Sequence, residues 1–380
     1  GMYLVNRMIA HGFLESWSRT ERKNGKAYTV RYLRLSEHLR TGSLEIMDVV
    51  ANAPRVAGPL IEPPKDWNAK TNTSGGYHTP EMQRLMPYAV QGNGPRPVAQ
   101  LPVTALNILQ RTAWRVNTTA LGVVTKMALK RDFGDVVSPE TGPMPDFPED
   151  PTDQQKKEWK AAARQWYTDK KTRAVHYRKS LRAISEARDL QSYTAIWFAY
   201  YADFRGRAYA RSAGLSPQGN VLEKGLIEFA VGQPLSTPEA VYWFKANGAN
   251  KYGLDKVPLA ERQGWVDAQH DFLVEMGTDP LAHPEWTEPD SPVQFLAWVI
   301  EYAEWVRDPA NFRTHLPLGQ DGTCNGLQNF SALMCDPVGG AAVNVVPSDA
   351  PRDIYPDVAK RVTELLEESE PGINRDAWLA

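Results

Sequence analysis

The chain has 380 residues, of which 42% are hydrophobic and 23% are charged, values near the average for folded globular proteins. Its length favours two or three packed substructures. Apolar stretches such as residues 295–299 are far shorter than the roughly 20 residues of a membrane-spanning helix, so we expect no membrane association. The only two cysteines, Cys324 and Cys335, exclude a disulfide framework and favour a reducing compartment such as the cytoplasm.

Charge is distributed unevenly along the chain. The net charge is -2, from 43 basic and 45 acidic residues. Residues 151–190 hold eleven basic and five acidic side chains, so this segment carries +6 and the remaining residues carry -8. A positive segment on an acidic body is suited to contacting the phosphates of a nucleic acid.

The first hundred residues predict the end of a larger domain and then a connector. Residues 4–16 have the apolar spacing of a short helix, and residues 28–35 alternate as a strand after an Asn-Gly turn. We assign residues 1–52 to this domain end. Prolines and glycines then accumulate, which predicts an extended connector over residues 53–103.

Two long helices are predicted next. Residues 104–131 place apolar side chains near helical spacing, and a proline-rich loop follows over residues 137–151. A second helix is predicted from about residue 152 to residue 190, and it holds the positive segment. Two such helices can pair antiparallel and project from a body, so we assign residues 104–194 to one projecting helical element.

Residues 195–380 predict a mainly helical body. Thr237 and Ser291 each place a capping hydroxyl before a proline, which predicts helices that begin at Pro238 and Pro292. The second of these helices has its apolar residues on one face, as a core-facing helix does. Together with the predicted strands, the pattern favours a predominantly helical α+β fold.

Residues 314–333 carry the main chemical signal. Leu316 and Leu318 predict a short strand, Asp321 and Gly322 a turn, and apolar residues at three-residue steps a following helix. A carboxylate and a backbone carbonyl at such a turn can hold a hard divalent cation, and the amides that open the helix can face a phosphate. From the spacing alone, an ordinary N-cap aspartate is the favoured alternative.

The motif Asp321-Gly-Thr-Cys-Asn-Gly-Leu-Gln-Asn-Phe-Ser-Ala-Leu resembles the first palm motif of single-subunit DNA-directed RNA polymerases, the bacteriophage-type and mitochondrial-like family. Asp203-Phe-Arg-Gly-Arg-Ala-Tyr209 is similar to a second motif of that family, and the two stand in the family's order. Weaker likeness reaches back to about residue 54. The resemblance implies part of a right-hand polymerase fold, with a helical thumb over residues 104–194 and the first half of a palm over residues 195–380.

The implied reaction is DNA-templated RNA synthesis, in which the RNA 3′-hydroxyl attacks the α-phosphate of a ribonucleoside triphosphate. Two Mg²⁺ ions, roughly 4 Å apart, activate the attacking oxygen and stabilise the leaving pyrophosphate. Asp321 matches the first metal-binding aspartate of the family, and Gly322 would offer its carbonyl. Gly326 matches the position at which related DNA polymerases carry a glutamate against the ribose 2′-hydroxyl, so room for a ribonucleotide is implied. The alternative for Gly326 is a plain turn glycine.

The resemblance also implies contacts with the DNA template and the RNA product. Arg205 and Arg207 flank a glycine, and guanidinium groups suit phosphates. Tyr209 could stack on a base and Lys224 could meet a phosphate, against the alternatives of a core aromatic and a surface cation. Six basic residues of the positive segment are candidates for thumb contacts to the hybrid backbone, against the alternative of a solvated helix face: Lys170, Lys171, Arg173, Arg178, Lys179 and Arg182.

The family's second metal-binding aspartate, and its helix with a triphosphate-binding lysine and a tyrosine, have no counterpart among the 380 residues. We therefore expect the chain alone to be inactive and a separate carboxyl-terminal polymerase fragment to be a possible partner. The alternatives are a non-catalytic nucleic-acid-binding relic or split-gene half, and a related DNA polymerase, which Gly326 disfavours.

Two further expectations concern origin. Asn329 and Cys335 depart from the family's usual residues, as they would in a divergent gene copy. The resemblance favours the cytoplasm of a phage-infected or prophage-carrying bacterial cell over an organelle.

Overall fold

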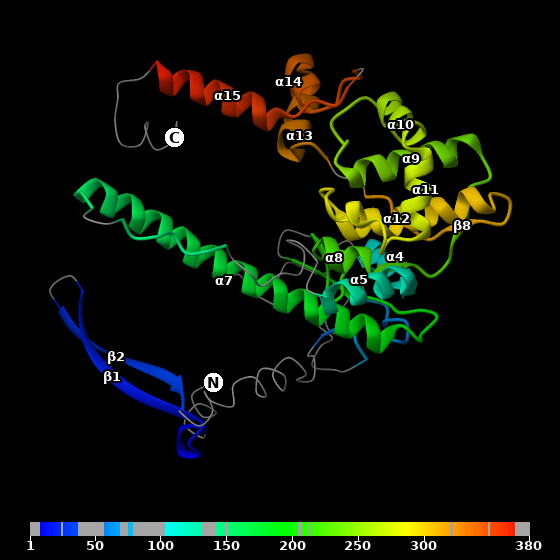
Figure 1. The fold of residues 1–380 in the computed structure, drawn as a ribbon. Helices are drawn as coiled ribbons and strands as arrows, with labels where there is room; N and C mark the ends of the chain where they lie inside the picture. Colours follow the sequence, from blue (N-terminus) through cyan, green and yellow to red (C-terminus); the bar gives the residue numbers. More distant parts are fainter. Residues whose placement is uncertain are drawn as a thin grey trace. The chain divides into compact units, whose positions relative to one another are not determined.

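A computed structural model of the chain describes residues 8–23, 26–36, 57–68, 75–78, 103–130, 142–148, 151–203, 207–212, 214–319, 322–348 and 350–368. Its contacts divide the chain into two compact units, residues 1–56 and 57–380 (Figure 1). The described part of the first unit is mainly a β-hairpin, and helices predominate in the second. This composition agrees with the predicted, predominantly helical α+β class.

The first unit contains an antiparallel hairpin of β1 (Leu14–Lys23) and β2 (Lys26–Leu35). Trp17 and Tyr32 lie opposite each other with ring centroids 5.4 Å apart, and such cross-strand pairs stabilise a sheet. The predicted strand over residues 28–35 is confirmed. The helix predicted over residues 4–16 is wrong at its carboxyl end, because residues 14–16 pair with β2.

The second unit is built around α12 (Pro292–Arg307), which lies within the helical body in Figure 1. Three helices pack against it, α8 (Val221–Gly225), α9 (Pro238–Tyr252) and α11 (His270–Thr278). α5 (Thr118–Lys130) and the 3-10 helix η3 (Pro284–Thr287) also contact α12, and α10 (Leu259–Ala268) packs on α9. The fully buried side chains of Trp286, Trp298 and Tyr302 form the centre of this core.

The helix starts predicted at Pro238 and Pro292 are confirmed. Thr237 Oγ1 accepts a hydrogen bond of 3.1 Å from the Ala240 N–H and caps α9, whereas the Ser291 side chain makes no such cap on α12. The predicted core-facing stripe of α12 is confirmed, since Phe295, Leu296 and Val299 are buried in the core. Burial extends beyond that stripe to most of residues 292–302, because helices surround α12.

Residues 103–130 form three elements, α4 (Val103–Arg111), β3 (Trp114–Val116) and α5. β3 pairs with β6 (Ile227–Phe229), and Trp114 exchanges two backbone hydrogen bonds with Ile196 at 2.8 and 2.6 Å. Asn117 Oδ1 then accepts from the Ala120 N–H at 2.9 Å, at the start of α5. The prediction of one helix is wrong because pairing with distant residues overrides the local helical spacing.

The second long helix is confirmed as α7 (Asp153–Leu190). Its amino end has a capping box, in which Gln155 N–H donates to Thr152 Oγ1 at 3.3 Å and Thr152 N–H donates to Gln155 Oε1 at 2.9 Å. Trp159 donates to the Pro145 carbonyl at 2.9 Å, and Trp166 to the Gly142 carbonyl at 2.6 Å. The predicted pairing of two long helices is therefore wrong, since the segment packed along the amino half of α7 is the irregular stretch 142–148.

The predicted connector is described at residues 57–68 and 75–78, which form only isolated bridges, Leu60 with Trp197 and Lys65 with Gly76. Trp67 is nevertheless buried, and its indole N–H donates to the Tyr200 carbonyl at 2.9 Å. This stretch has little regular structure, as predicted, and it is fastened to the body by its backbone and by Trp67.

The segment around the predicted metal site begins with β8 (Arg313–Thr314), which pairs with β7 (Gln233–Pro234). The strand predicted over residues 316–318 is wrong, because the paired residues lie just before it. α13 (Asn325–Met334) confirms the predicted helix, and α14 (Pro337–Ala342) and α15 (Ile354–Glu367) follow. Leu327, Phe330 and Leu333, the apolar residues of the α13 prediction, are 44, 67 and 81% exposed.

Candidate functional site

The predicted metal segment is described on both sides of Asp321, which itself lies outside the described residues together with Gln320. Gly322 lies against the first turn of α13: a Cβ atom built on it would be 2.2 Å from Asn325 Oδ1 and 3.0 Å from Gln328 Oε1. Only glycine fits beside these amide oxygens without a shift of one of them. A Cβ atom built on Gly326 meets nothing within 4 Å, so the space that the ribose prediction requires is open.

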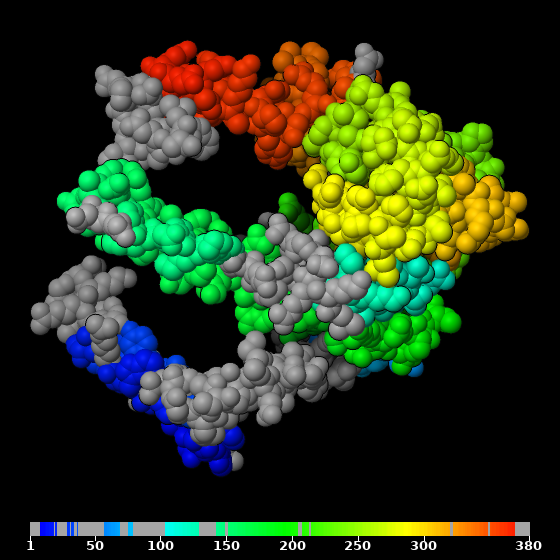
Figure 2. Space-filling model, in the orientation of Figure 1, coloured from blue at the N-terminus to red at the C-terminus, as the bar shows by residue number. Residues whose placement is uncertain are grey.

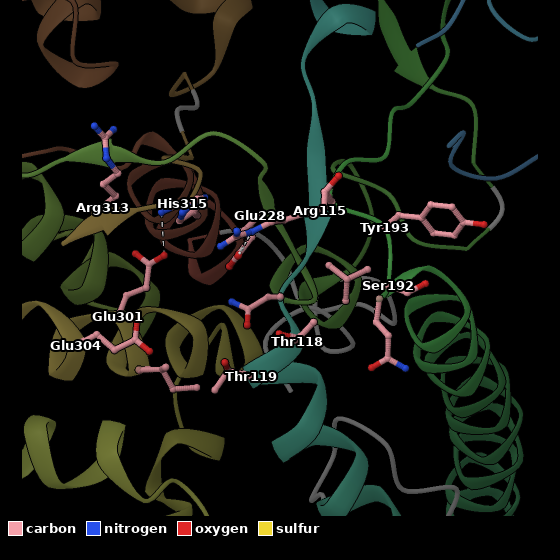
Figure 3. Close-up of a pocket in the computed structure, with 15 residues that line it drawn as sticks. Arg115, Thr118, Thr119, Ser192, Tyr193, Glu228, Glu301, Glu304, Arg313 and His315 are labelled. Atoms are coloured by element: carbon pink, nitrogen blue, oxygen red, sulfur yellow. Dashed lines mark hydrogen bonds and ion pairs between the residues drawn. The ribbon is translucent and has the colours of Figure 1, made fainter. Parts of the chain in front are cut away.

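β8 and its neighbours anchor the chain before Asp321 (Figure 3). Thr314 Oγ1 donates to Glu301 Oε2 at 2.6 Å, and the His315 N–H donates to Glu301 Oε1 at 2.8 Å. His315 Nδ1 lies 2.7 Å from the Phe229 carbonyl oxygen and so donates to it, while the Phe229 N–H donates to the His315 carbonyl at 2.8 Å. The start of the metal segment is therefore held between α12 and β6.

A cavity of about 360 Å³ lies beside this anchor, and Figure 3 shows the residues that line it. Ionisable side chains from several elements line it, namely Arg115, Glu228, Glu301, Glu304, Arg313 and His315. Burial raises the pKa of Glu301 to about 8, so this carboxyl is mostly protonated at neutral pH. Burial also raises the pKa of Glu228, against the opposing effect of its 2.7 Å hydrogen bond from Arg115 Nε.

The second motif forms a short hairpin of β4 (Tyr200–Ala202) and β5 (Ala208–Ala210). Arg205 lies outside the described residues, and Arg207 is exposed at the edge of the hairpin. Asp203 Oδ1 accepts from the Arg207 N–H at 2.9 Å, which ties the two ends of the connecting loop together. The half-buried Tyr209 pairs across the hairpin with Tyr201, with ring centroids 5.8 Å apart.

The six candidate thumb residues lie on different sides of α7, much of whose surface is visible in Figure 2. At about 100° per residue, Lys171, Arg178, Lys179 and Arg182 fall within about 100° of one another, and all four are exposed. We call these four the basic face. Lys170 falls on another side, with its ammonium 4.7 Å from the Trp166 ring, and Arg173 is half-buried on the side that carries Trp159 and Trp166.

α8 brings Lys224 next to Glu223, and Asn220 caps this helix by accepting from the Glu223 N–H at 2.9 Å. The pKa of Glu223 is raised to about 7, chiefly by burial, while the positive charges of Lys179 and Lys224 act to lower it. Two of the predicted phosphate contacts, one from α7 and one from α8, therefore lie around one carboxyl group.

Sequence reasoning missed three ionisable groups of the cavity, Glu228, Glu301 and Arg115. Glu301 did carry a signal, because it interrupts the apolar run of α12. A charged residue in such a run must either reach solvent or find partners inside. Among the described residues, no group of three or more His, Cys, Asp or Glu side chains could hold a metal ion.

Comparison with known proteins identifies relatives. A family model described as DNA-dependent RNA polymerase matches residues 234–379. The DNA-directed RNA polymerase of Enterobacteria phage T3 is 37% identical over 85% of this chain and 38% of its own length. T7 RNA polymerase of Escherichia phage T7 is 35% identical over 81% of this chain and 36% of its own length. The mitochondrial DNA-directed RNA polymerase 1B of Nicotiana tabacum is 32% identical over 81% of this chain and 32% of its own length.

The chain belongs to the single-subunit, phage-type RNA polymerase family. The family resemblance drawn from the Asp321 and Asp203 motifs is thereby confirmed. The chain spans 32 to 38% of the length of these three polymerases. No helix in the described ranges has both the length and the apolar character needed to cross a bilayer.

Proposed function

We propose that these 380 residues form part of a DNA-directed RNA polymerase that adds ribonucleotides to an RNA 3′ end on a DNA template. The similarity of more than four fifths of the chain to phage polymerases of that name carries this proposal. In a right-hand arrangement, residues 104–194 would serve as the thumb and residues 195–380 as the first part of the palm. Residues 1–52 would end an amino-terminal domain, and residues 53–103 would connect the two.

Asp321 and the Gly322 carbonyl are the proposed Mg²⁺ ligands. The neighbours of Gly322 fit such an ion, because Asn325 Oδ1 and Gln328 Oε1 add oxygen donors, the type that Mg²⁺ takes. When bound, the two ions of the complete active site would activate the attacking hydroxyl and stabilise charge on the leaving group. The chain's own contribution is to fix the segment, through the hydrogen bonds of Glu301 to Thr314 and His315.

The substrates and nucleic-acid partners follow from the same proposal. Open space at Gly326 would admit the 2′-hydroxyl of a ribonucleoside triphosphate. Arg205, Arg207, Tyr209 and Lys224 would contact the DNA template and the hybrid, and the basic face of α7 would contact hybrid phosphates.

RNA extension from a preassembled primer-template scaffold tests the proposal. The 380-residue chain is assayed with Mg²⁺ and ribonucleotides, alone and with a carboxyl-terminal fragment of a family polymerase. Asp321→Asn removes the proposed ligand charge and keeps the side-chain size. The matched control is Asp336→Asn, because Asp336 caps α14 through a 3.0 Å hydrogen bond from the Val338 N–H, a role that asparagine also fills.

We expect extension only with the added fragment, with loss of nearly all activity in Asp321→Asn and retention in Asp336→Asn. Extension by the chain alone would contradict the prediction that its 380 residues are insufficient. Scaffold binding without extension in any combination would favour the non-catalytic, nucleic-acid-binding alternative instead.

A further inference from the structure

A lysine side chain of α9 lies near the chain that leads to Asp321. Lys251 is in the last turn of α9, and its Nζ would be 3.5 Å from a Cβ atom built on Gly319. Lys224 extends from α8. The pKa of Lys251 is lowered, first by burial and then by the positive charge of Lys224.

The described part of the chain supplies no ion-pair partner for either lysine. Other lysines of the same region do have carboxylate partners: Lys245 of α9 pairs with Asp267, and Lys256 lies 3.6 Å from both Asp255 and Asp353. Glu223 is next to Lys224, but its raised pKa of about 7 leaves it only partly ionised at neutral pH. Among the described residues, the positive charges of Lys224 and Lys251 are therefore only partly balanced.

A partly buried ammonium group without a counter-charge is costly, and an anion that enters from solvent offsets that cost. Gly319 has no side chain to fill the space in front of the Lys251 Nζ. Lysine binds phosphate as a point charge and does not require a fixed fork geometry. A tetrahedral phosphate oxyanion is thus the chemistry that suits this position.

We propose that Lys251 binds a phosphate group beside Gly319, at the entrance to the segment that carries Asp321, and that the positive charge of Lys224 adds to the attraction. This inference rests on the proposed function for its ligand class. The phosphate would belong either to a ribonucleoside triphosphate or to the backbone of the nucleic acid. Lys251 is then a binding residue of the polymerase that neither sequence motif contains.

Binding measurements on the intact 380-residue chain test this site without requiring catalysis. Inorganic tripolyphosphate and an RNA–DNA hybrid are titrated separately, by calorimetry and by fluorescence anisotropy, over a series of salt concentrations. Lys251→Met removes the charge and keeps the length of the side chain. Lys251→Arg keeps the charge, and Lys245→Met is the matched control on the same helix. Circular dichroism shows whether each variant keeps its helices.

For Lys251→Met we expect affinity for one of the two probes to fall about tenfold or more, as for a lost charge-assisted contact. Lys251→Arg and Lys245→Met should bind as the unchanged chain does. Loss confined to tripolyphosphate assigns the site to the nucleotide, and loss confined to the hybrid, with a salt slope about one unit smaller, assigns it to the backbone.

Unchanged binding of both probes by a folded Lys251→Met variant overturns the inference, as does failure of the unchanged chain to bind either probe. Failure of the proposed function would look different from failure of this inference. RNA extension would then be absent, while Lys251→Met would still bind one of the two probes more weakly than the unchanged chain.

Discussion

α12 and α7 are both long helices, and they are stabilised in different ways. α12 is buried along residues 292–302 and is surrounded by α5, α8, α9 and α11. α7 has 38 residues, and apart from Ala163 its buried positions lie between Ser180 and Ala187. Its amino half is fixed by a capping box and by two tryptophan contacts to an irregular stretch.

α12 is therefore stabilised mainly by tertiary packing, and the amino half of α7 mainly by local interactions. A helix buried on all sides derives its stability from packing, so substitutions in it should affect the whole unit. An exposed helix depends on caps, on neighbours within one turn and on a few contacts, so substitutions in it should act locally. Its exposed charges are then available for binding.

The largest expected effect is in α12, at Trp298. This side chain is fully buried, and its indole N–H donates to the Phe244 carbonyl at 2.8 Å. Trp298→Ala should lower the free energy of unfolding by about 3 to 5 kcal/mol, because it leaves a large cavity. Urea denaturation measures this. Trp243→Ala, at a tryptophan of α9 that is 44% exposed, is the control and should cost about 1 kcal/mol or less. Equal costs would contradict the view that α12 is the centre of the core.

Glu301 gives the second prediction, a pH dependence of stability. Its folded pKa of about 8 lies above the usual value of 4.5, so between these pH values the folded state holds a proton that the unfolded state releases. Stability should therefore fall as pH rises from about 4.5 to 8, by up to about 1.4 kcal/mol per pH unit from this group. Glu301→Gln should flatten that slope in denaturation curves measured across the window. If stability fell equally with pH in the unchanged chain and in Glu301→Gln, the raised pKa assigned to Glu301 would be contradicted.

Features decided by neighbouring residues could be predicted from the sequence. Thr237 caps α9 as predicted, and the helix expected from about residue 152 begins there with Thr152 as its cap, because an N-cap needs only a side-chain oxygen and the next turn. The cap predicted at Ser291 does not form, although the helix begins where expected. β3 could not be predicted, because Trp114 pairs with Ile196 and Phe229, residues far along the chain. The same holds for α12, whose pattern indicates an apolar face but does not say how many helices surround it.

The same distinction, between features set by local sequence and features set by distant neighbours, applies to the candidate site. The Asp321 motif was recognised by its resemblance to a family, and the relatives bear the family out. Lys251 and Glu301 went unnoticed, because their significance depends on burial by other elements and on neighbours such as Lys224 and Thr314. Lys170 and Lys171 are adjacent in sequence, but only Lys171 belongs to the basic face, because neighbouring residues of a helix point in different directions.

The basic face gives the third prediction, which concerns binding and not stability. Lys171→Gln combined with Arg182→Gln should weaken binding of an RNA–DNA hybrid about tenfold and reduce the salt slope by about two units. The control is Lys170→Gln combined with Arg188→Gln, which removes the same charge from exposed positions on another side of α7. Both variants should unfold within about 0.5 kcal/mol of the unchanged chain. If both double variants lost the same affinity for the hybrid, the total charge of α7 would matter and the position of that charge on the basic face would not.

The smallest expected effect is at the amino end of α7. Thr152→Ala removes the hydroxyl that accepts from the Gln155 N–H, at a cost of about 1 kcal/mol. Because the amino half of α7 has few buried contacts, the cost should be local: amide hydrogen exchange should speed up about fivefold in the first turns of α7 and stay unchanged in α12. Thr152→Ser, which keeps the cap, should leave both helices unchanged. Faster exchange in α12 as well would mean that the end of α7 is coupled to the core, and the distinction between the two helices would then fail.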